Sequence, residues 1–68
     1  MDSYWRQRLY DILSQVGKVS SSEILNLWNE VLDDMYGEDS ERKKAVLDVA
    51  IQDDKISSDA RKWLKSLV

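Results

Sequence analysis

The chain has 68 residues, which is enough for one domain, residues 1–68, with a small hydrophobic core. It contains no cysteine and no histidine, so disulfides, thiolate or imidazole zinc sites and histidine-based acid–base catalysis are excluded. The net charge is −3, and no apolar run is longer than three residues, whereas a membrane span needs roughly 20. Together with an N-terminus that lacks the pattern of a signal peptide, these features predict a cytoplasmic protein with no membrane partner.

The first predicted helix spans residues 3–16. Its apolar side chains recur three or four positions apart, so they fall on one face of a helix that turns by about 100° per residue. Gly17 follows the last of them, as expected of a glycine that ends a helix. The apolar side chains of this helix are Trp5, Leu9, Ile12, Leu13 and Val16.

The second predicted helix spans residues 20–36 and begins within the stretch KVSSSEIL. Ser20 can cap this helix, and Glu23 can return a hydrogen bond from three residues further on. Gly37 follows the last apolar residue and ends the helix. The apolar side chains cover about half of the helix circumference, and they are Ile24, Leu25, Leu27, Trp28, Val31, Leu32, Met35 and Tyr36.

Two further helices are predicted over residues 40–52 and 57–67. Asp39 or Ser40 can cap the first of them, and Ser57 can cap the second. The apolar stretch within the first would also suit a short buried strand. Its two alanines and the charges on either side of it favour a helix.

Four short helices, no proline and only two glycines predict an all-α fold, a small four-helix domain built as two packed helical hairpins. The stretch KVSSSEIL returns 37 residues later as KISSDARK, which suggests an internal repeat with pseudo-twofold symmetry. Chance similarity between two capped hairpins is the alternative. The predicted core consists of Trp5, Leu9, Ile12, Val16, Ile24, Trp28, Val31, Met35, Val46, Ala50, Ile56, Trp63 and Leu64.

The 37-residue period and the turn that contains Gly17 and Glu23 resemble a pair of EF-hands. The resemblance concerns shape alone. A calcium loop needs oxygen ligands at alternate positions before its glycine, and here those positions hold Ile12, Ser14 and Val16. We therefore predict no metal site and no cofactor.

The sequence also offers no set of side chains suited to catalysis. The neighbouring carboxylates Asp33 and Asp34, and likewise Asp53 and Asp54, have no nucleophile beside them. Adjacent residues of a helix also point about 100° apart. We therefore expect no enzymatic activity and no catalytic residue.

Charge is divided unevenly along the chain. Residues 1–41 carry nine acidic and three basic side chains, whereas residues 42–68 carry four acidic and seven basic ones. A small regulator of the helix–turn–helix type, which would bind nucleic acid through the basic face of residues 42–65, is therefore the alternative function. The contact residues would be Arg42, Lys43, Lys44, Arg61, Lys62 and Lys65. The predicted second helix has no lysine or arginine on its polar face, which disfavours nucleic acid as a partner.

The function favoured by elimination is a non-catalytic protein–protein interaction module that acts as an adaptor, regulator or inhibitor. Carboxylates on the outer face of the second helix would steer a basic partner, and side chains at the edges of the apolar faces would anchor it. The partner is another protein, and a second copy of this chain, in a homo-oligomer, is one such partner. The candidate partner-binding residues are Glu30, Asp33, Asp34, Glu38, Tyr4, Tyr10, Leu27 and Tyr36.

Overall fold

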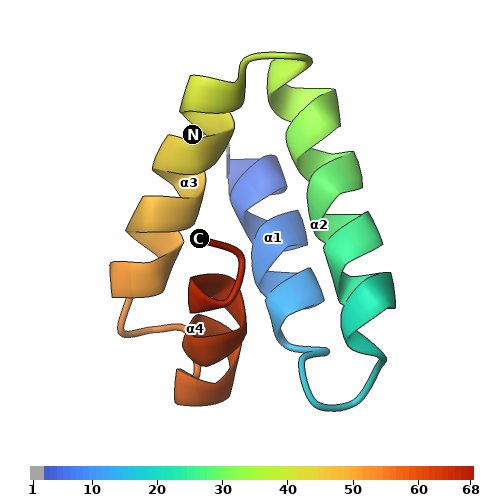
Figure 1. The fold of residues 1–68 in the computed structure, drawn as a ribbon, viewed down its shortest axis with the longest axis vertical. Coiled ribbons are helices and arrows are strands. Elements are labelled where there is room, and N and C mark those ends of the chain that lie inside the picture. The colour runs from blue at the N-terminus through green and yellow to red at the C-terminus, as the bar shows by residue number, and fades with distance from the viewer. Residues whose placement is uncertain (1–2) are drawn as a thin grey trace.

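The computed structural model describes residues 3–68, and these residues form four α-helices and no strand beyond a single bridge between Val16 and Val19. The helices are α1 (Ser3–Leu13), α2 (Ser21–Tyr36), α3 (Ser40–Gln52) and α4 (Ser58–Lys65) (Figure 1). The predicted all-α class is confirmed. Residues 1 and 2 of the predicted domain lie outside the described residues. None of the helices within residues 3–68 has the length and apolar character needed to cross a membrane.

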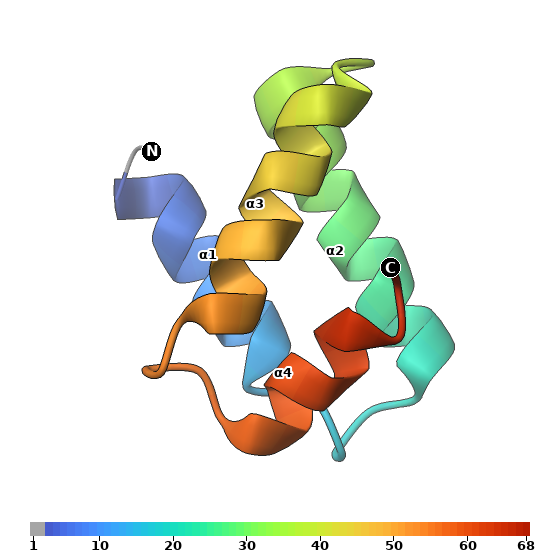
Figure 2. The same ribbon diagram turned by 60° about the vertical axis from the view of Figure 1, so that its left-hand side comes forward.

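The helices pair in the order of the chain. α1 packs along α2 and α3 packs on α4, so both predicted hairpins are present. The turn between α2 and α3 lies at one end of the molecule, and the loops that close the two hairpins lie at the other end together with α4 (Figure 1). From the side, the first turns of α1 stand apart from α3, and α4 crosses the lower ends of the other helices (Figure 2).

One cluster of buried side chains joins all four helices. Trp28 of α2 meets Trp63 of α4 edge to face, with ring centroids 6.4 Å apart and an interplanar angle of 83°, an arrangement that aromatic pairs prefer. The buried hydrophobic side chains are Leu9, Ile12, Leu13, Ile24, Trp28, Val31, Leu32, Val46, Ala50, Ile56, Ala60 and Leu64. In a chain without cysteine, burial of these side chains is the main source of stability.

The buried core differs from the predicted core at seven residues. Four residues predicted for the core are only partly buried, namely Trp5, Val16, Met35 and Trp63. Trp5 belongs to the first turns of α1, which stand apart from α3 (Figure 2), and Val16 follows the end of α1. Three buried residues were absent from the predicted core, namely Leu13, Leu32 and Ala60. Ala60 of α4 is 1% exposed and belongs to the buried cluster that joins the helices.

α1 is shorter than predicted. The helix ends at Leu13 and not at residue 16, because the amides of Gln15 and Val16 donate to carbonyls three residues back, at 3.0 and 3.2 Å. Such tightened turns are common at the ends of helices. Gly17 then adopts a φ of 88°, which a glycine reaches without steric cost.

Three other predicted boundaries move by one or two residues. α2 begins at Ser21 and α4 at Ser58, one residue later than predicted, because Ser20 and Ser57 precede the helices as caps. α4 ends at Lys65 and not at residue 67. The amide of Leu67 donates to the carbonyl three residues back, at 3.0 Å, so the chain ends in a tight turn.

The repeated serine motif marks two helix starts. The Ser20 side chain accepts a hydrogen bond from the backbone N–H of Glu23 at 3.4 Å, and Ser57 accepts one from Ala60 at 3.2 Å. Asp39 caps α3 in the same way through the N–H of Arg42, at 3.2 Å. The predicted capping roles of Ser20, Ser57 and Asp39 are therefore confirmed, although the Glu23 side chain forms no hydrogen bond back to Ser20 among the described residues. The sequence echo corresponds to equivalent positions in the two hairpins.

Replacing either serine cap with alanine is expected to lower the free energy of unfolding by about 0.5 to 2 kcal/mol. Ser21→Ala is the matched control, because Ser21 is exposed in the first turn of α2 and does not cap it. Urea unfolding followed by circular dichroism measures the difference. Equal stabilities for Ser20→Ala and Ser21→Ala would contradict the capping role of Ser20.

Candidate functional site

The structure divides the candidate partner-binding residues between several places. Leu27, Glu30 and Asp34 are three or four residues apart and share one flank of α2. The ion pair between Arg8 of α1 and Asp34 shows that this flank faces α1. Tyr4 lies one turn before Arg8 on the same side of α1. We call the surface made by these side chains the α1–α2 face, and it consists of Tyr4, Trp5, Arg8, Glu23, Leu27, Glu30 and Asp34.

Arg8 connects the aromatic side chains of this face to α2. Its guanidinium carbon lies 5.9 Å from the ring centroid of Tyr4 and 5.4 Å from that of Trp5. Its Nη1 atom lies 3.7 Å from Oδ2 of Asp34. The Tyr4 and Trp5 rings meet edge to face, with centroids 5.1 Å apart. Cation–π contacts and an ion pair therefore order the exposed end of α1 against α2.

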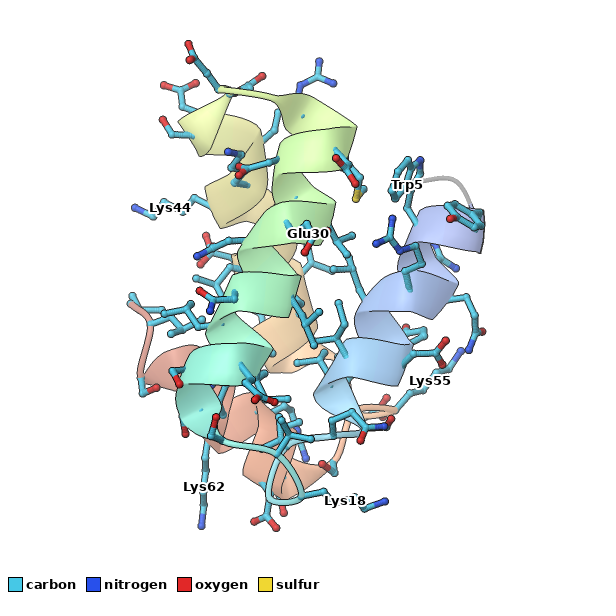
Figure 3. The ribbon with its side chains drawn as sticks, turned by 90° about the vertical axis from the view of Figure 1, so that its right-hand side faces the viewer. Trp5, Lys18, Glu30, Lys44, Lys55 and Lys62 are labelled. Carbon is cyan, nitrogen blue, oxygen red and sulfur yellow. The ribbon has the colours of Figure 1, made fainter. Side chains whose placement is uncertain are left out.

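Apolar and acidic side chains alternate on the α1–α2 face. Tyr4 is 59% exposed and Leu27 is 42% exposed. Leu27 lies one helical turn from both Glu23 and Glu30, and neither carboxylate forms an ion pair with another residue of the 3–68 segment. Glu30 stands on the outer surface of α2 (Figure 3). The face thus presents an exposed leucine between two exposed carboxylates.

The other carboxylate candidates and Tyr36 lie elsewhere. Asp33 occupies the opposite flank of α2 and forms an ion pair with Lys43 of α3. Tyr36 is partly buried and packs against the core beside α3. Glu38 is exposed in the turn between α2 and α3. Asp33 and Asp34 are adjacent in the sequence but take part in different contacts. The reason is that neighbouring residues on a helix point about 100° apart.

Tyr10 joins the two hairpins. Its hydroxyl donates a hydrogen bond of 2.7 Å to Oδ2 of Asp53, which follows α3, and both side chains are partly buried. This hydrogen bond, reinforced by burial, raises the pKa of Tyr10 above its ordinary value of 10.0. The same hydrogen bond, followed by one from the backbone N–H of Lys55 at 2.9 Å, lowers the pKa of Asp53 below its ordinary value of 3.8.

The Tyr10–Asp53 hydrogen bond predicts how stability depends on pH. Because the folded state lowers the pKa of Asp53, its contribution is complete above 3.8 and is lost as the pH falls through the lower folded value. Because the folded state raises the pKa of Tyr10, its contribution is complete below 10.0 and is lost as the pH rises through the higher folded value.

Tyr10→Phe is therefore expected to be less stable than the wild type by a constant amount between these limits. The difference should shrink in stronger acid and in stronger base. Urea unfolding of both proteins across the pH range measures it. A difference that stays constant down to the acid limit would show that the hydrogen bond does not stabilise the fold.

The basic residues that would bind nucleic acid in the alternative function do not form one continuous surface. Arg42 lies 3.4 Å from Asp39, and Lys43 pairs with Asp33. Arg61 is partly buried, and its Nε atom has no hydrogen-bond partner among residues 3–68. Lys44 and Lys62 project from the molecule in different directions (Figure 3). This arrangement gives nucleic acid less support than the α1–α2 face gives a protein partner.

Arg8 and Trp5 were absent from the predicted partner-binding set. The spacing of four residues between Tyr4 and Arg8 on a helix is a signal that could have found Arg8. The contact between Arg8 and Asp34 joins two helices, so no local spacing indicates it. No group of three or more histidine, cysteine, aspartate or glutamate side chains within residues 3–68 is arranged to hold a metal ion.

Comparisons of the chain with protein-family models, with curated proteins and with solved structures find no match.

Proposed function

We propose that the chain is a cytoplasmic, non-catalytic module that binds another protein through the α1–α2 face. The partner would present an apolar side chain surrounded by lysine or arginine. The observation that carries this proposal is the position of Leu27, which is exposed between Glu23 and Glu30 on the same flank of α2 as Asp34, the partner of Arg8. Isolated exposed leucines are common, but this one lies within an ordered acidic and aromatic surface.

The composition of the face supports a role in protein recognition. Tyrosine, tryptophan and arginine are the side chains most enriched among the residues that dominate binding energy at protein interfaces. Here Tyr4, Trp5 and Arg8 contact one another before any partner binds. Side chains that are already ordered lose less conformational entropy when they bind.

The carboxylates give the face its selectivity. Asp34 is paired with Arg8, whereas Glu23 and Glu30 are available to a partner's cations. Exposed charges of this kind mainly raise the rate of association and orient the partner, while the buried apolar contact supplies most of the affinity. We therefore expect binding to weaken when salt screens the charges.

The absence of catalysis is part of the same proposal. The chain has no histidine or cysteine, and the carboxylates Asp33 and Asp34 are held by basic residues from different helices. A general acid–base pair needs two groups aimed at one substrate position. Asp33 and Asp34 lie on different flanks of α2 and do not meet that requirement.

Reversing two charges of the face is expected to abolish partner binding. In affinity capture from the native host, Glu30→Lys/Asp34→Lys should lose the proteins retained by the wild type, with affinity lower by at least about tenfold. Asp33 is left unchanged because it contacts Lys43. The matched control is Asp48→Lys/Asp59→Lys, which makes the same change in net charge at exposed positions on α3 and α4.

The control double variant should retain the partners of the wild type. Far-ultraviolet circular dichroism and thermal unfolding verify that both double variants are folded. If the same proteins remain bound to Glu30→Lys/Asp34→Lys at unchanged affinity, the α1–α2 face is not the interface.

A further inference from the structure

A second surface of the molecule has the opposite charge. A furrow of about 280 Å³ runs between α1 and α3, and buried core side chains such as Trp28 and Ala50 form its floor. Arg6 of α1 and Lys55 of the loop after α3 stand at its rim. Val49 of α3, also at the rim, is 68% exposed. We call this surface the α1–α3 furrow.

The rim of the furrow carries available positive charge. Arg6 and Lys55 are exposed, and neither forms an ion pair with any other residue in the described part of the chain. Asp53, which also lines the furrow, accepts hydrogen bonds from Tyr10 and from the backbone of Lys55 and is attracted electrostatically to Arg6 and Lys55, so the two cations at the rim outnumber the one carboxylate. The furrow therefore suits a ligand that has an apolar side chain flanked by carboxylates.

The α1–α2 face has that chemistry. Leu27 is the exposed apolar side chain, and Glu30 and Asp34 lie within two helical turns of it. Apart from Tyr4 and the terminal Val68, Leu27 and Val49 are the large hydrophobic side chains exposed among residues 3–68. Leu27 lies on a surface with more carboxylates than cations, and Val49 lies at the rim of a furrow with more cations than carboxylates.

We propose that the α1–α2 face of one molecule docks into the α1–α3 furrow of a second copy of this chain. Leu27 would pack beside Val49, and Glu23 and Glu30, the carboxylates beside Leu27 that form no ion pair within residues 3–68, would approach Arg6 and Lys55. The proposal rests on the proposed function, because it names the basic partner of the same face as another copy. The two surfaces complement each other in charge and in apolar character.

The contact joins copies head to tail. Arg8 belongs to the face and Arg6 to the furrow, and residues two apart on a helix point about 200° apart, so the two surfaces lie on opposite sides of α1. Figure 3 shows Glu30 on the α2 surface towards the viewer and Lys55 at the edge of the molecule beyond α1. When two copies meet through different patches, one copy keeps a free face and the other keeps a free furrow. Further copies can bind there, so the contact does not close as a symmetric pair.

Each contact is small, because the domain measures only 27 × 24 × 23 Å. Protein–protein interfaces that bury little surface are weak and transient, so we expect a dissociation constant for self-association on the order of 0.1 mM. The charges that orient the two surfaces are exposed to solvent. Raising the ionic strength from about 0.02 M to about 0.5 M should therefore return the protein to monomers.

Sedimentation equilibrium with two charge-reversed double variants tests this contact. At about 1 mM protein in low salt, the wild type should show a weight-average mass clearly above the monomer mass of 8.0 kDa. Glu30→Lys/Asp34→Lys has two basic surfaces and Arg6→Glu/Lys55→Glu has two acidic ones, so each alone should remain a monomer. An equimolar mixture should associate again, because both kinds of contact between the two variants join opposite charges.

The control double variant Asp48→Lys/Asp59→Lys, which changes neither surface, should associate like the wild type. A wild type that stays monomeric at about 1 mM, or a mixture that stays monomeric while the wild type associates, would overturn the proposed contact. The proposed function would fail separately. It fails if a captured partner binds Glu30→Lys/Asp34→Lys unchanged, whatever the self-association of the chain.

Discussion

Leu64→Ala is expected to lower the free energy of unfolding by about 2 to 5 kcal/mol. Leu64 has no exposed surface, and it belongs to α4, the helix that closes the core beneath the other three. Removing three carbon atoms there costs their transfer free energy and leaves a cavity that close-packed neighbours fill only in part. A domain of 68 residues has a total stability of only about 3 to 10 kcal/mol.

Leu27→Ala is the matched control, because it makes the same chemical change at a leucine that is 42% exposed. We expect a change in stability of less than about 1 kcal/mol at Leu27, together with weaker partner binding. Denaturant unfolding of both variants measures the contrast. Equal losses of stability at the two positions would contradict the position of the core.

Gly37→Ala should produce the second largest loss, about 1 to 3 kcal/mol. Gly37 ends α2 with φ 61° and ψ −120°, and its N–H donates to the carbonyl of Asp33 at 2.8 Å. An L-alanine is strained in this conformation. No atom lies within 4 Å of the position that a Cβ would take, so the backbone conformation alone causes the loss.

A D-alanine at position 37 separates backbone strain from crowding, and a chain of this length is within reach of chemical synthesis. D-residues favour positive φ, so this protein should be as stable as the wild type, or more stable by about 0.4 to 1 kcal/mol because its unfolded state is more restricted. Thermal unfolding of both synthetic proteins gives the answer. If the D-alanine protein loses as much stability as Gly37→Ala, the positive φ is not the cause of the loss.

The sequence predicts the features that depend on local chemistry. Ser20, Ser57 and Asp39 cap their helices as their side chains and positions indicate. Apolar spacing also identifies most of the buried side chains, including Trp28 and Leu64. These features follow from one helix at a time, and each is encoded within a few residues.

Contacts between helices were not predictable in the same way. Asp33 and Asp34 are adjacent in sequence, yet one pairs with α3 and the other with α1. The hydrogen bond from Tyr10 to Asp53 joins residues from different hairpins. These pairs depend on how the helices pack. The sequence therefore predicts an acidic surface on α2, but it does not indicate which carboxylates face α1 and which face α3.

The grouping of Tyr4, Arg8, Leu27, Glu30 and Asp34 on one face emerges only when α1 and α2 are placed together. The sequence indicated four of these residues as candidates, and Arg8 became part of the face through its contacts. Because Asp33 contacts Lys43 and not the α1–α2 face, the charge-reversal experiment needs only Glu30 and Asp34, and the ion pair of Asp33 can be left intact.

Nuclear magnetic resonance can locate the partner interface residue by residue. Amide shifts of the isotope-labelled chain would be followed as the unlabelled partner recovered by affinity capture is added. We predict that the largest changes fall on residues 4, 8, 27, 30 and 34, and that Glu30→Lys/Asp34→Lys removes them. Changes concentrated on residues 42–49 of α3, with the α1–α2 face unaffected, would contradict the account.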